Sequence, residues 1–107
     1  MDTPSESGFL YLTTVGGKSG RFHRIEIWFV SFEGNYYIIS ELGEKADFVQ
    51  NVKHNRKVQF TVENQTFDGW GRLVDWKESE LCNRIMSLMY SKYGWSEGLI
   101  VELRPNR

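Results

Sequence analysis

The part of the sequence best suited to chemistry is a short basic connection. The stretch from Gly16 to Arg24 contains Lys18, Arg21 and Arg24 and no carboxylate. Glycine has no Cβ, so its backbone N–H can approach a phosphate closely, and nearby cations offset the phosphate charge. The stretch 13–28 therefore predicts an anion-binding loop between two strands. On local composition alone, a solvated basic hairpin loop explains the same residues equally well.

Two further groups of residues have a structural and a functional interpretation. Lys53, His54, Arg56 and Lys57 follow one another at the end of a predicted helix. They either interact with the helix C-terminus or give a second contact for a long anionic ligand. Aromatic residues also gather where a second helix ends; they either pack against the sheet or line the mouth of a site for a planar substrate. These residues are Tyr90, Tyr93 and Trp95.

Other kinds of catalytic site are disfavoured. Gly17-Lys18-Ser19 resembles the end of a phosphate-binding P-loop, but Leu12 stands where that motif needs glycine and a strand follows in place of a helix. His23 and His54 are the only histidines and have no metal-ligand spacing, so no metal is expected. Cys82 lies in an amphipathic segment, where a packed residue is expected rather than a nucleophile.

The composition indicates one globular domain. The chain has 107 residues, 40% of them hydrophobic, 15% aromatic and 25% charged, with a net charge of −1. We expect a flexible N-terminal tail over 1–8 and a single domain over 9–107. A single cysteine fits a reducing compartment, no apolar run is long enough to span a membrane, and the polar start is unlike a signal peptide. A cytoplasmic protein is expected.

Hydrophobic periodicity predicts a mainly β, α+β fold, a small antiparallel barrel with packed helices. Asp75 and Glu78 form a capping-box-like pair at the start of the second helix, and Gly94 ends it. Strand 25–32 is apolar on both faces, so both faces must be covered. Six strands are expected over 9–15, 25–32, 36–40, 58–62, 66–76 and 99–103, and two helices over 44–55 and 75–93.

Several motifs of the sequence, taken in order, resemble those of a known family. Thr14-x-Gly16-x-Lys18-Ser19-Gly20-Arg21, followed by a strand ending in Trp28-Phe29-Val30, resembles the deazaflavin-dependent nitroreductase and quinone reductase family. Two later stretches continue it: Tyr36-Tyr37-Ile38-Ile39-Ser40 with Glu44 to Asn51, and Lys92-Tyr93-Gly94-Trp95 with the last strand. No single motif establishes the resemblance, but the order and spacing of the motifs agree with the family over nearly the whole chain from about Phe9.

The resemblance implies a split β-barrel of the FMN-binding type and the coenzyme F420, a deazaflavin with a phosphate and a glutamate tail. Residues 17–19 would hold the phosphate and tail, 23–28 and 39–42 would flank the ring, and 48–51 would complete the site. The implied coenzyme-binding residues are Gly17, Lys18, Ser19, Arg21, His23, Arg24, Ile25, Glu26, Ile27, Trp28, Ile39, Ser40, Glu41, Leu42, Phe48 and Asn51. The family often has Arg where this chain has Gly17, and FMN in the same cleft is the nearest alternative.

The sequence thus predicts an oxidoreductase that uses reduced F420 to reduce a quinone, a nitro compound or a similar conjugated acceptor. The coenzyme would carry the hydride chemistry, and Tyr90 or Tyr93 would donate a proton or hydrogen bond to the acceptor. The expected partners are this small-molecule acceptor and a second copy of the chain. Two alternatives from another class stay open, a coenzyme carrier without turnover and a module that stacks single-stranded nucleic acid. The net charge counts against nucleic acid.

Overall fold

Seven strands form one antiparallel sheet in the order β2-β1-β5-β6-β7-β4-β3. The structure is a computed structural model, and it describes residues 8–17 and 19–106. Most of the expected tail 1–8, and Lys18, therefore lie outside the described residues. The strands are β1 (Leu10–Val15), β2 (Phe22–Ile27), β3 (Val30–Phe32), β4 (Asn35–Ser40), β5 (Lys57–Val62), β6 (Gln65–Leu73) and β7 (Leu99–Pro105).

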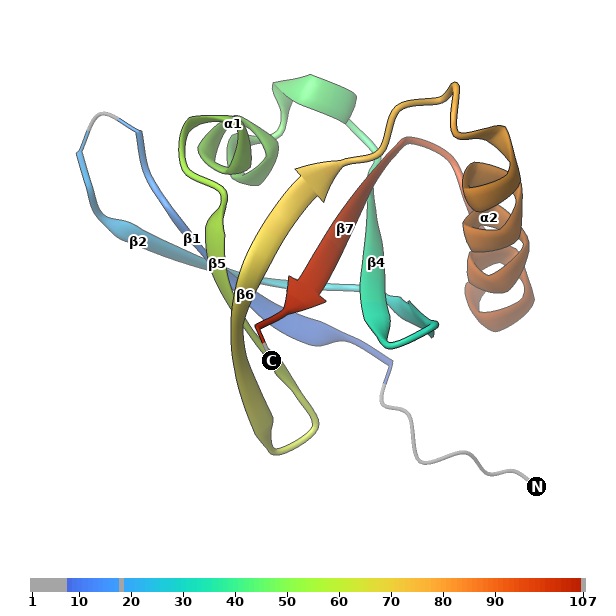
Figure 1. Cartoon of the computed structure of the whole chain (residues 1–107), viewed down its shortest axis with the longest axis horizontal. Coiled ribbons are helices and arrows are strands. Elements are labelled where there is room, and N and C mark those ends of the chain that lie inside the picture. Colours follow the sequence, from blue (N-terminus) through green and yellow to red (C-terminus); the bar gives the residue numbers. More distant parts are fainter. Residues whose placement is uncertain (1–7, 18, 107) are drawn as a thin grey trace.

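The two outer strands of this sheet are neighbours in the chain. β2 and β3 stand at opposite edges of the sheet order, yet only Trp28 and Phe29 separate Ile27 from Val30. The two edges must therefore come together at Trp28 and Phe29, which curls the sheet into a half-barrel (Figure 1). We call this junction the seam.

The expected fold class is confirmed, with one correction to the strands. The single strand predicted over 25–32 is two strands, so the sheet has seven strands and not six. At the seam the Phe29 backbone is bound by side chains of the second helix. The Phe29 N–H donates to the Tyr93 hydroxyl at 3.0 Å, and Lys92 Nζ donates to the Phe29 carbonyl at 2.9 Å. These bonds replace the strand ladder, which is why β2 ends before Phe29.

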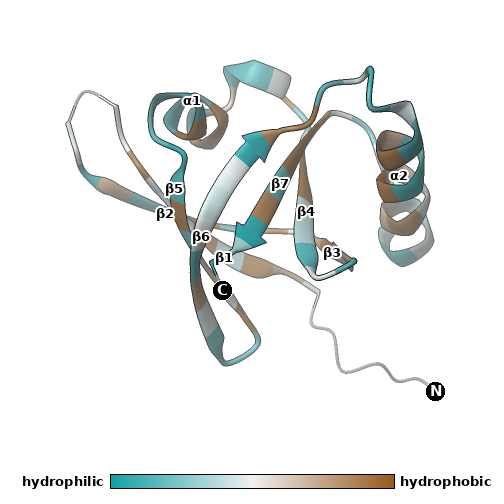
Figure 2. Cartoon of the chain, viewed as in Figure 1, coloured by the Kyte–Doolittle hydropathy of each residue, from teal (hydrophilic) through white to brown (hydrophobic). Residues whose placement is uncertain are grey.

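Both faces of the central strands are buried, but in different clusters. Ile38 of β4 and Val101 of β7 lie in the barrel interior, while their neighbours Ile39 and Ile100 pack outside with the second helix. Figure 2 shows hydrophobic residues on that helix and on the strands beside it. The predicted faces of 25–32 are also confirmed: one set packs on the interior cluster and the other on the outer one. The interior set is Ile25, Ile27 and Phe29; the outer set includes Val30 and Phe32.

Two α-helices cover different parts of the sheet. α1 (Asp47–His54) contacts β1 and β6, and α2 (Ser79–Tyr93) contacts β3. A 3₁₀ turn, η1 (Gly43–Lys45), precedes α1, so the helix predicted over 44–55 is shorter than expected. α2 also begins later than predicted, because Glu78 precedes the helix with a non-helical backbone (φ −80°, ψ 62°). Its side chain still accepts the Asp75 N–H at 3.2 Å, the contact expected of the predicted pair. Gly94 ends α2 in the left-handed conformation, as predicted.

No helix among residues 8–17 and 19–106 has the length and hydrophobicity needed to cross a membrane.

Candidate functional site

An apolar pocket of about 550 Å³ opens at the seam. Its size falls within the range of small-molecule sites. β2 and the seam supply one wall; the end of β4 and the start of α1 supply the other. The lining residues are Phe9, Glu26, Ile27, Trp28, Ile39, Ser40, Glu41, Leu42, Ala46, Phe48 and Trp95. We call this hollow the seam pocket.

Trp28 gives the seam pocket a flat aromatic wall. Its ring stacks on Tyr93 with centroids 4.4 Å apart and planes 3° apart, and Trp95 meets it edge-on at 6.0 Å. The indole is nevertheless 46% exposed, because only one of its faces is covered. A half-covered indole offers a planar ligand a stacking surface that is already held in place.

The Tyr93 hydroxyl holds this wall to the barrel. It accepts from the Phe29 N–H and lies 2.9 Å from the Phe29 carbonyl and 2.6 Å from the Gly8 carbonyl, to either of which it can donate. With these backbone partners, Tyr93 acts as a positioning residue for the seam. Tyr90, the other tyrosine considered as a proton donor, is exposed and does not line the seam pocket.

The opposite wall is fixed by a local polar contact. The Ser40 hydroxyl is buried and donates to the Gly43 carbonyl at 2.8 Å, which holds η1 against the end of β4. Glu26 and Glu41 are exposed at the rim. The seam pocket therefore has an apolar floor and carboxylates at its edge.

The β1–β2 connection forms a compact turn, which we call the tip loop (residues 16–21, of which Lys18 is outside the described residues). The Gly16 N–H donates to the Arg21 carbonyl at 2.7 Å, and the Gly20 N–H donates back to the Gly16 carbonyl at 2.9 Å. The Ser19 hydroxyl accepts the Arg21 N–H at 3.1 Å. These bonds fix the backbone of a loop that carries glycines and an exposed arginine.

Two imidazoles cover the glycines of the tip loop. A Cβ on Gly16 would lie 3.0 Å from Nε2 of His23, and a Cβ on Gly17 would overlap the ring of His54. His23 comes from β2 and His54 from the last turn of α1. The sequence had grouped His54 with a second basic cluster, but nothing in the sequence indicated that this ring lies over Gly17.

The structure separates the implied coenzyme residues into three sets. Those at the seam pocket are Glu26, Ile27, Trp28, Ile39, Ser40, Glu41, Leu42 and Phe48; those at the tip loop are Gly17, Ser19, Arg21 and His23. The remaining three described residues make contacts with other parts of the barrel. Ile25 packs on the interior cluster, Arg24 lies 4.2 Å from the Tyr11 ring centroid, and Asn51 Nδ2 donates to Thr14 Oγ1 at 3.0 Å.

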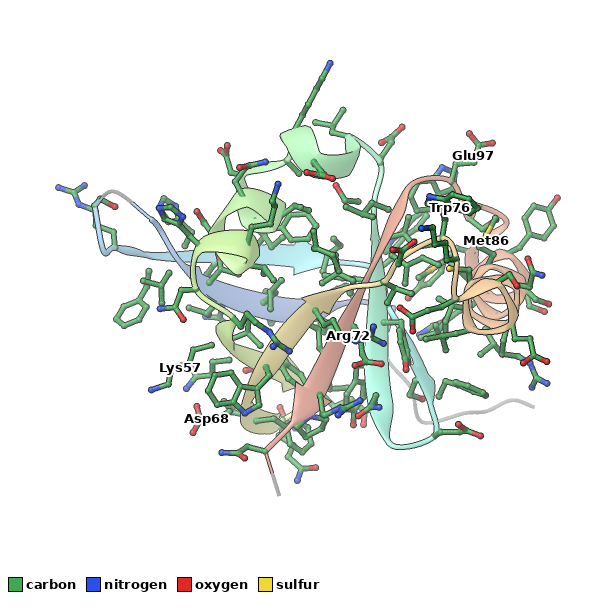
Figure 3. All side chains as sticks on the ribbon, turned by 45° about the horizontal axis from the view of Figure 1, so that its top comes forward. Lys57, Asp68, Arg72, Trp76, Met86 and Glu97 are labelled. Carbon is green, nitrogen blue, oxygen red and sulfur yellow. The ribbon has the colours of Figure 1, made fainter. Side chains whose placement is uncertain are left out.

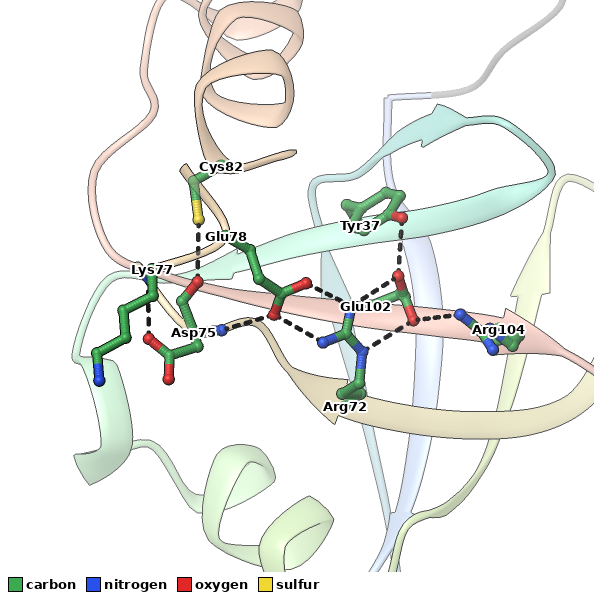
Figure 4. A network of polar contacts seen from close by, with 8 residues as sticks. All are labelled: Tyr37, Arg72, Asp75, Lys77, Glu78, Cys82, Glu102 and Arg104. Atoms are coloured by element: carbon green, nitrogen blue, oxygen red, sulfur yellow. Dashed lines mark hydrogen bonds and ion pairs between the residues drawn. The ribbon is translucent and has the colours of Figure 1, made fainter. Parts of the chain in front are cut away.

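A second polar region lies outside the seam pocket (Figure 4). Arg72 binds Glu78 at 2.8 Å and Glu102 at 3.2 Å, and Tyr37 donates to Glu102 at 2.9 Å. Burial alone would raise the pKa of Glu102, but the hydrogen bonds from Arg72 and Tyr37 hold it below its ordinary value. Burial and the hydrogen bond to Glu102 raise the pKa of Tyr37 to about 12. We call these residues, with Arg104, the Arg72 network.

Nucleophile and metal chemistry find little support. Burial raises the pKa of the Cys82 thiol, which makes it less reactive, and its sulfur lies 3.5 Å from the Asp75 carbonyl. Within 8–17 and 19–106, no three His, Cys, Asp or Glu side chains are grouped so that they could hold a metal ion.

The model of the F420H(2)-dependent quinone reductase family matches residues 3–97 of the chain. The chain belongs to this family. The family model covers the tip loop, the seam pocket and both helices. No curated protein matches the chain.

Solved structures share the fold at low sequence identity. An F420-H2 dependent reductase, FDR-A, is 20% identical, with a TM-score of 0.70, over 96% of this chain and 98% of its own. The heme storage protein HutZ from Vibrio cholerae is 21% identical, with a TM-score of 0.77, over 94% of this chain and 82% of its own. A FAD-binding protein from Mesorhizobium loti is 14% identical, with a TM-score of 0.71, over 94% and 83%.

The residues present fit an elongated coenzyme of the kind that this family's name implies. The seam pocket offers a flat aromatic wall for a ring, and the tip loop offers an anion the exposed Arg21 and the imidazoles that lie over Gly16 and Gly17. α1 runs between them: Phe48 lines the seam pocket and His54 covers Gly17. His54 follows Phe48 by six residue steps along the helix, a rise of about 9 Å.

Proposed function

We propose that this chain binds reduced F420 and uses it to reduce a quinone, a nitro compound or a similar conjugated acceptor. The observation that carries the proposal is the pairing of an apolar aromatic pocket with a basic glycine loop along one helix. A planar redox ring with an anionic tail is the ligand that matches both ends. Family membership supports the same choice of coenzyme.

The residues of the chain would then have distinct tasks. Gly17, Lys18 and Ser19 would hold the phosphate and tail, while Trp28 and the β4 end (39–42) would enclose the ring. Phe48 would close the seam pocket from α1, and its apolar surroundings would exclude water from the reacting face. Bound F420 supplies the hydride, so the protein's task is to orient the ring and the acceptor.

Titration of the purified protein with F420 and separately with FMN tests this proposal. Coenzyme fluorescence should change saturably with F420, and the reduced coenzyme should be oxidised when a quinone or nitro acceptor is added. Binding of neither coenzyme would contradict the proposal. Saturable F420 binding without turnover on a panel of acceptors would favour a coenzyme carrier instead.

FMN is the second candidate for the same pocket. The fold similarity to a FAD-binding protein supports a flavin, since that protein shares the half-barrel. A flavin phosphate could use the same tip loop, but FMN has no glutamate tail to reach further along it. Tighter binding of FMN than of F420 in the titration would decide for the flavin.

We also infer a homodimer formed through the outer face of β2, β1, β5 and β6. Phe22 is 78% exposed there, and it shares a groove with Trp70, Lys57 and Asp68. Figure 3 shows the side chains of Lys57 and Asp68 near each other. Aromatic side chains flanked by charges of both signs suit a self-complementary contact between two identical surfaces. Sedimentation should show a dimer, and Trp70→Lys should convert it to a monomer. A monomeric wild type would refute the inference.

The single cysteine supports a cytoplasmic location.

A further inference from the structure

We propose that His54 is a binding residue for the anionic tail of the coenzyme, acting from α1 across Gly17. The proposal rests on the proposed function, since it assigns one more residue to the same ligand. It concerns a side chain outside the set that the sequence resemblance implied. Its basis is the geometry between the end of α1 and the tip loop.

The first step is the contact between His54 and Gly17. The volume that a side chain at position 17 would occupy is filled by the His54 imidazole. Glycine at this position therefore leaves room for a ring from another element. An imidazole carries an N–H donor in both protonation states and a positive charge when protonated, so it can bind phosphate or carboxylate oxygens.

The second step is that three neighbouring cations already have partners. Lys53 Nζ lies 2.7 Å from a Glu44 oxygen, and Arg56 Nε donates to the Gly71 carbonyl at 3.1 Å. Arg24 lies over the Tyr11 ring. In the described part of the chain, by contrast, no carboxylate lies within ion-pair distance of His54. Of the basic group at the end of α1, His54 is the side chain that lies against the tip loop.

The third step is the direction of α1. Phe48, Asn51 and His54 recur every third residue, so they follow one another around about one third of the circumference of α1. Phe48 lines the seam pocket, Asn51 binds Thr14 of β1, and His54 covers the tip loop. A ligand whose ring enters the seam pocket and whose tail follows this side of α1 would reach His54 with its anionic end.

The test compares two ligands: F420 and the same deazaflavin without the phosphate and glutamate tail. His54→Ala should weaken F420 binding roughly tenfold to a hundredfold, the range for a charge-assisted hydrogen bond. It should leave binding of the tail-less deazaflavin unchanged, because the ring does not reach His54. Lys77→Ala is the matched control: it removes an exposed basic side chain in the turn before α2 and should alter neither affinity.

Two further variants separate an electrostatic role from packing. His54→Gln keeps an N–H donor over Gly17 but cannot become positively charged, so it should lose part of the F420 affinity that His54→Ala loses. The double variant Gly17→Arg with His54→Ala should recover most of that affinity, because the emptied volume accepts a new cation from the other side. Full F420 affinity in His54→Gln, or no recovery in the double variant, would overturn the electrostatic role.

The outcomes also distinguish this inference from the proposed function. If the wild type binds F420 and His54→Ala binds it equally well, only the role of His54 is overturned. If the wild type binds neither F420 nor the tail-less deazaflavin, the proposed function is overturned and the inference with it. Urea unfolding of each variant confirms that every protein compared is folded.

Discussion

The molecule contains two charged regions that use their charges in opposite ways. In the Arg72 network, Arg72 and Arg104 each bind a carboxylate, and Glu102 has three partners although it is only 3% exposed. At the tip loop, Arg21, His23 and His54 have no carboxylate within ion-pair distance among the residues described. The charges of the first region are paired with one another, whereas the basic side chains of the second are available to bind an external anion.

Burial explains the difference. A carboxylate as buried as Glu102 loses its hydration, so it is tolerated only when paired and hydrogen-bonded. Arg21, His23 and His54 at the tip loop are exposed to water, so they need no internal partner and can bind an external anion. Charge of this kind beside glycines and an apolar pocket is a stronger sign of binding than charge alone. The comparison therefore predicts that mutations in the first region affect stability and mutations in the second affect ligand affinity.

Arg72→Met should have the largest effect of the changes considered. It leaves the buried Glu102 without its main partner and detaches Glu78 of the turn before α2. Loss of one partner from a buried pair costs about 3–5 kcal/mol, and the Arg72 side chain is 35% exposed. We therefore expect the free energy of unfolding in urea to fall by about 2–4 kcal/mol.

Arg104→Met provides the matched control within the same network. Arg104 also binds Glu102, at 3.3 Å, but its side chain is 61% exposed. Its removal should change the free energy of unfolding by no more than about 0.5 kcal/mol. Equal losses in the two variants would show that burial does not govern this network.

Lys18→Ala tests the opposite half of the comparison. Loss of one charged hydrogen bond to the phosphate or tail should weaken F420 binding by about 1–3 kcal/mol. The free energy of unfolding should stay within about 0.5 kcal/mol of the wild type if Lys18 serves the ligand and not the fold. Fluorescence titration and urea unfolding measure the two quantities on the same samples. Lower stability with unchanged F420 affinity would make the tip loop a structural element.

Tyr93→Phe tests whether the Tyr93 hydroxyl at the seam contributes to stability or to the reaction. The change keeps the stack on Trp28 but removes the acceptor of the Phe29 N–H and the donor to the neighbouring carbonyls. The free energy of unfolding should fall by about 1–2 kcal/mol. A loss of turnover with unchanged stability would instead assign the hydroxyl to the chemistry.

The alternation of side chains was enough to predict much of the fold. It separated Ile25, Ile27 and Phe29 from Val30 and Phe32, because period-two burial is a local property of the strand. It could not locate the break at the seam. That break depends on Tyr93 and Lys92, which lie more than sixty residues further along the chain and bind the Phe29 backbone.

The site was predictable to a different degree at its two ends. The composition of the tip loop predicted an anion site, since glycine and basic residues are contiguous there, but it predicted a solvated basic loop equally well. The seam-pocket residues followed only from the family resemblance, because nothing local shows that Trp28 and Leu42 face the same hollow. The position of His54 over Gly17 depends on how α1 packs, which no local pattern reveals.

Titrating the Arg72 network should have a smaller effect than Arg72→Met, because protonation of Glu102 leaves Arg72 and its contact with Glu78 in place. The pKa of Glu102 in the folded protein lies below its ordinary value, because the hydrogen bonds from Arg72 and Tyr37 outweigh the opposing effect of burial. A lowered pKa means that the unfolded chain binds the proton more tightly. The carboxylate therefore contributes stability above the unfolded pKa of about 4.3, and this contribution is lost as the pH falls through the folded value.

Urea unfolding measured from about pH 7 to about pH 3 should show this loss, and Glu102→Gln should flatten the acid part of the curve. Glu78, whose pKa is also lowered by its hydrogen bond to Arg72, keeps some slope in that variant. An unchanged acid slope in Glu102→Gln would mean that the buried carboxylate does not sense its partners as its geometry implies. The contrast between a region of paired charges and a region of unpaired basic side chains would then lose its electrostatic basis. This would hold even if Arg72→Met proved strongly destabilising through lost packing.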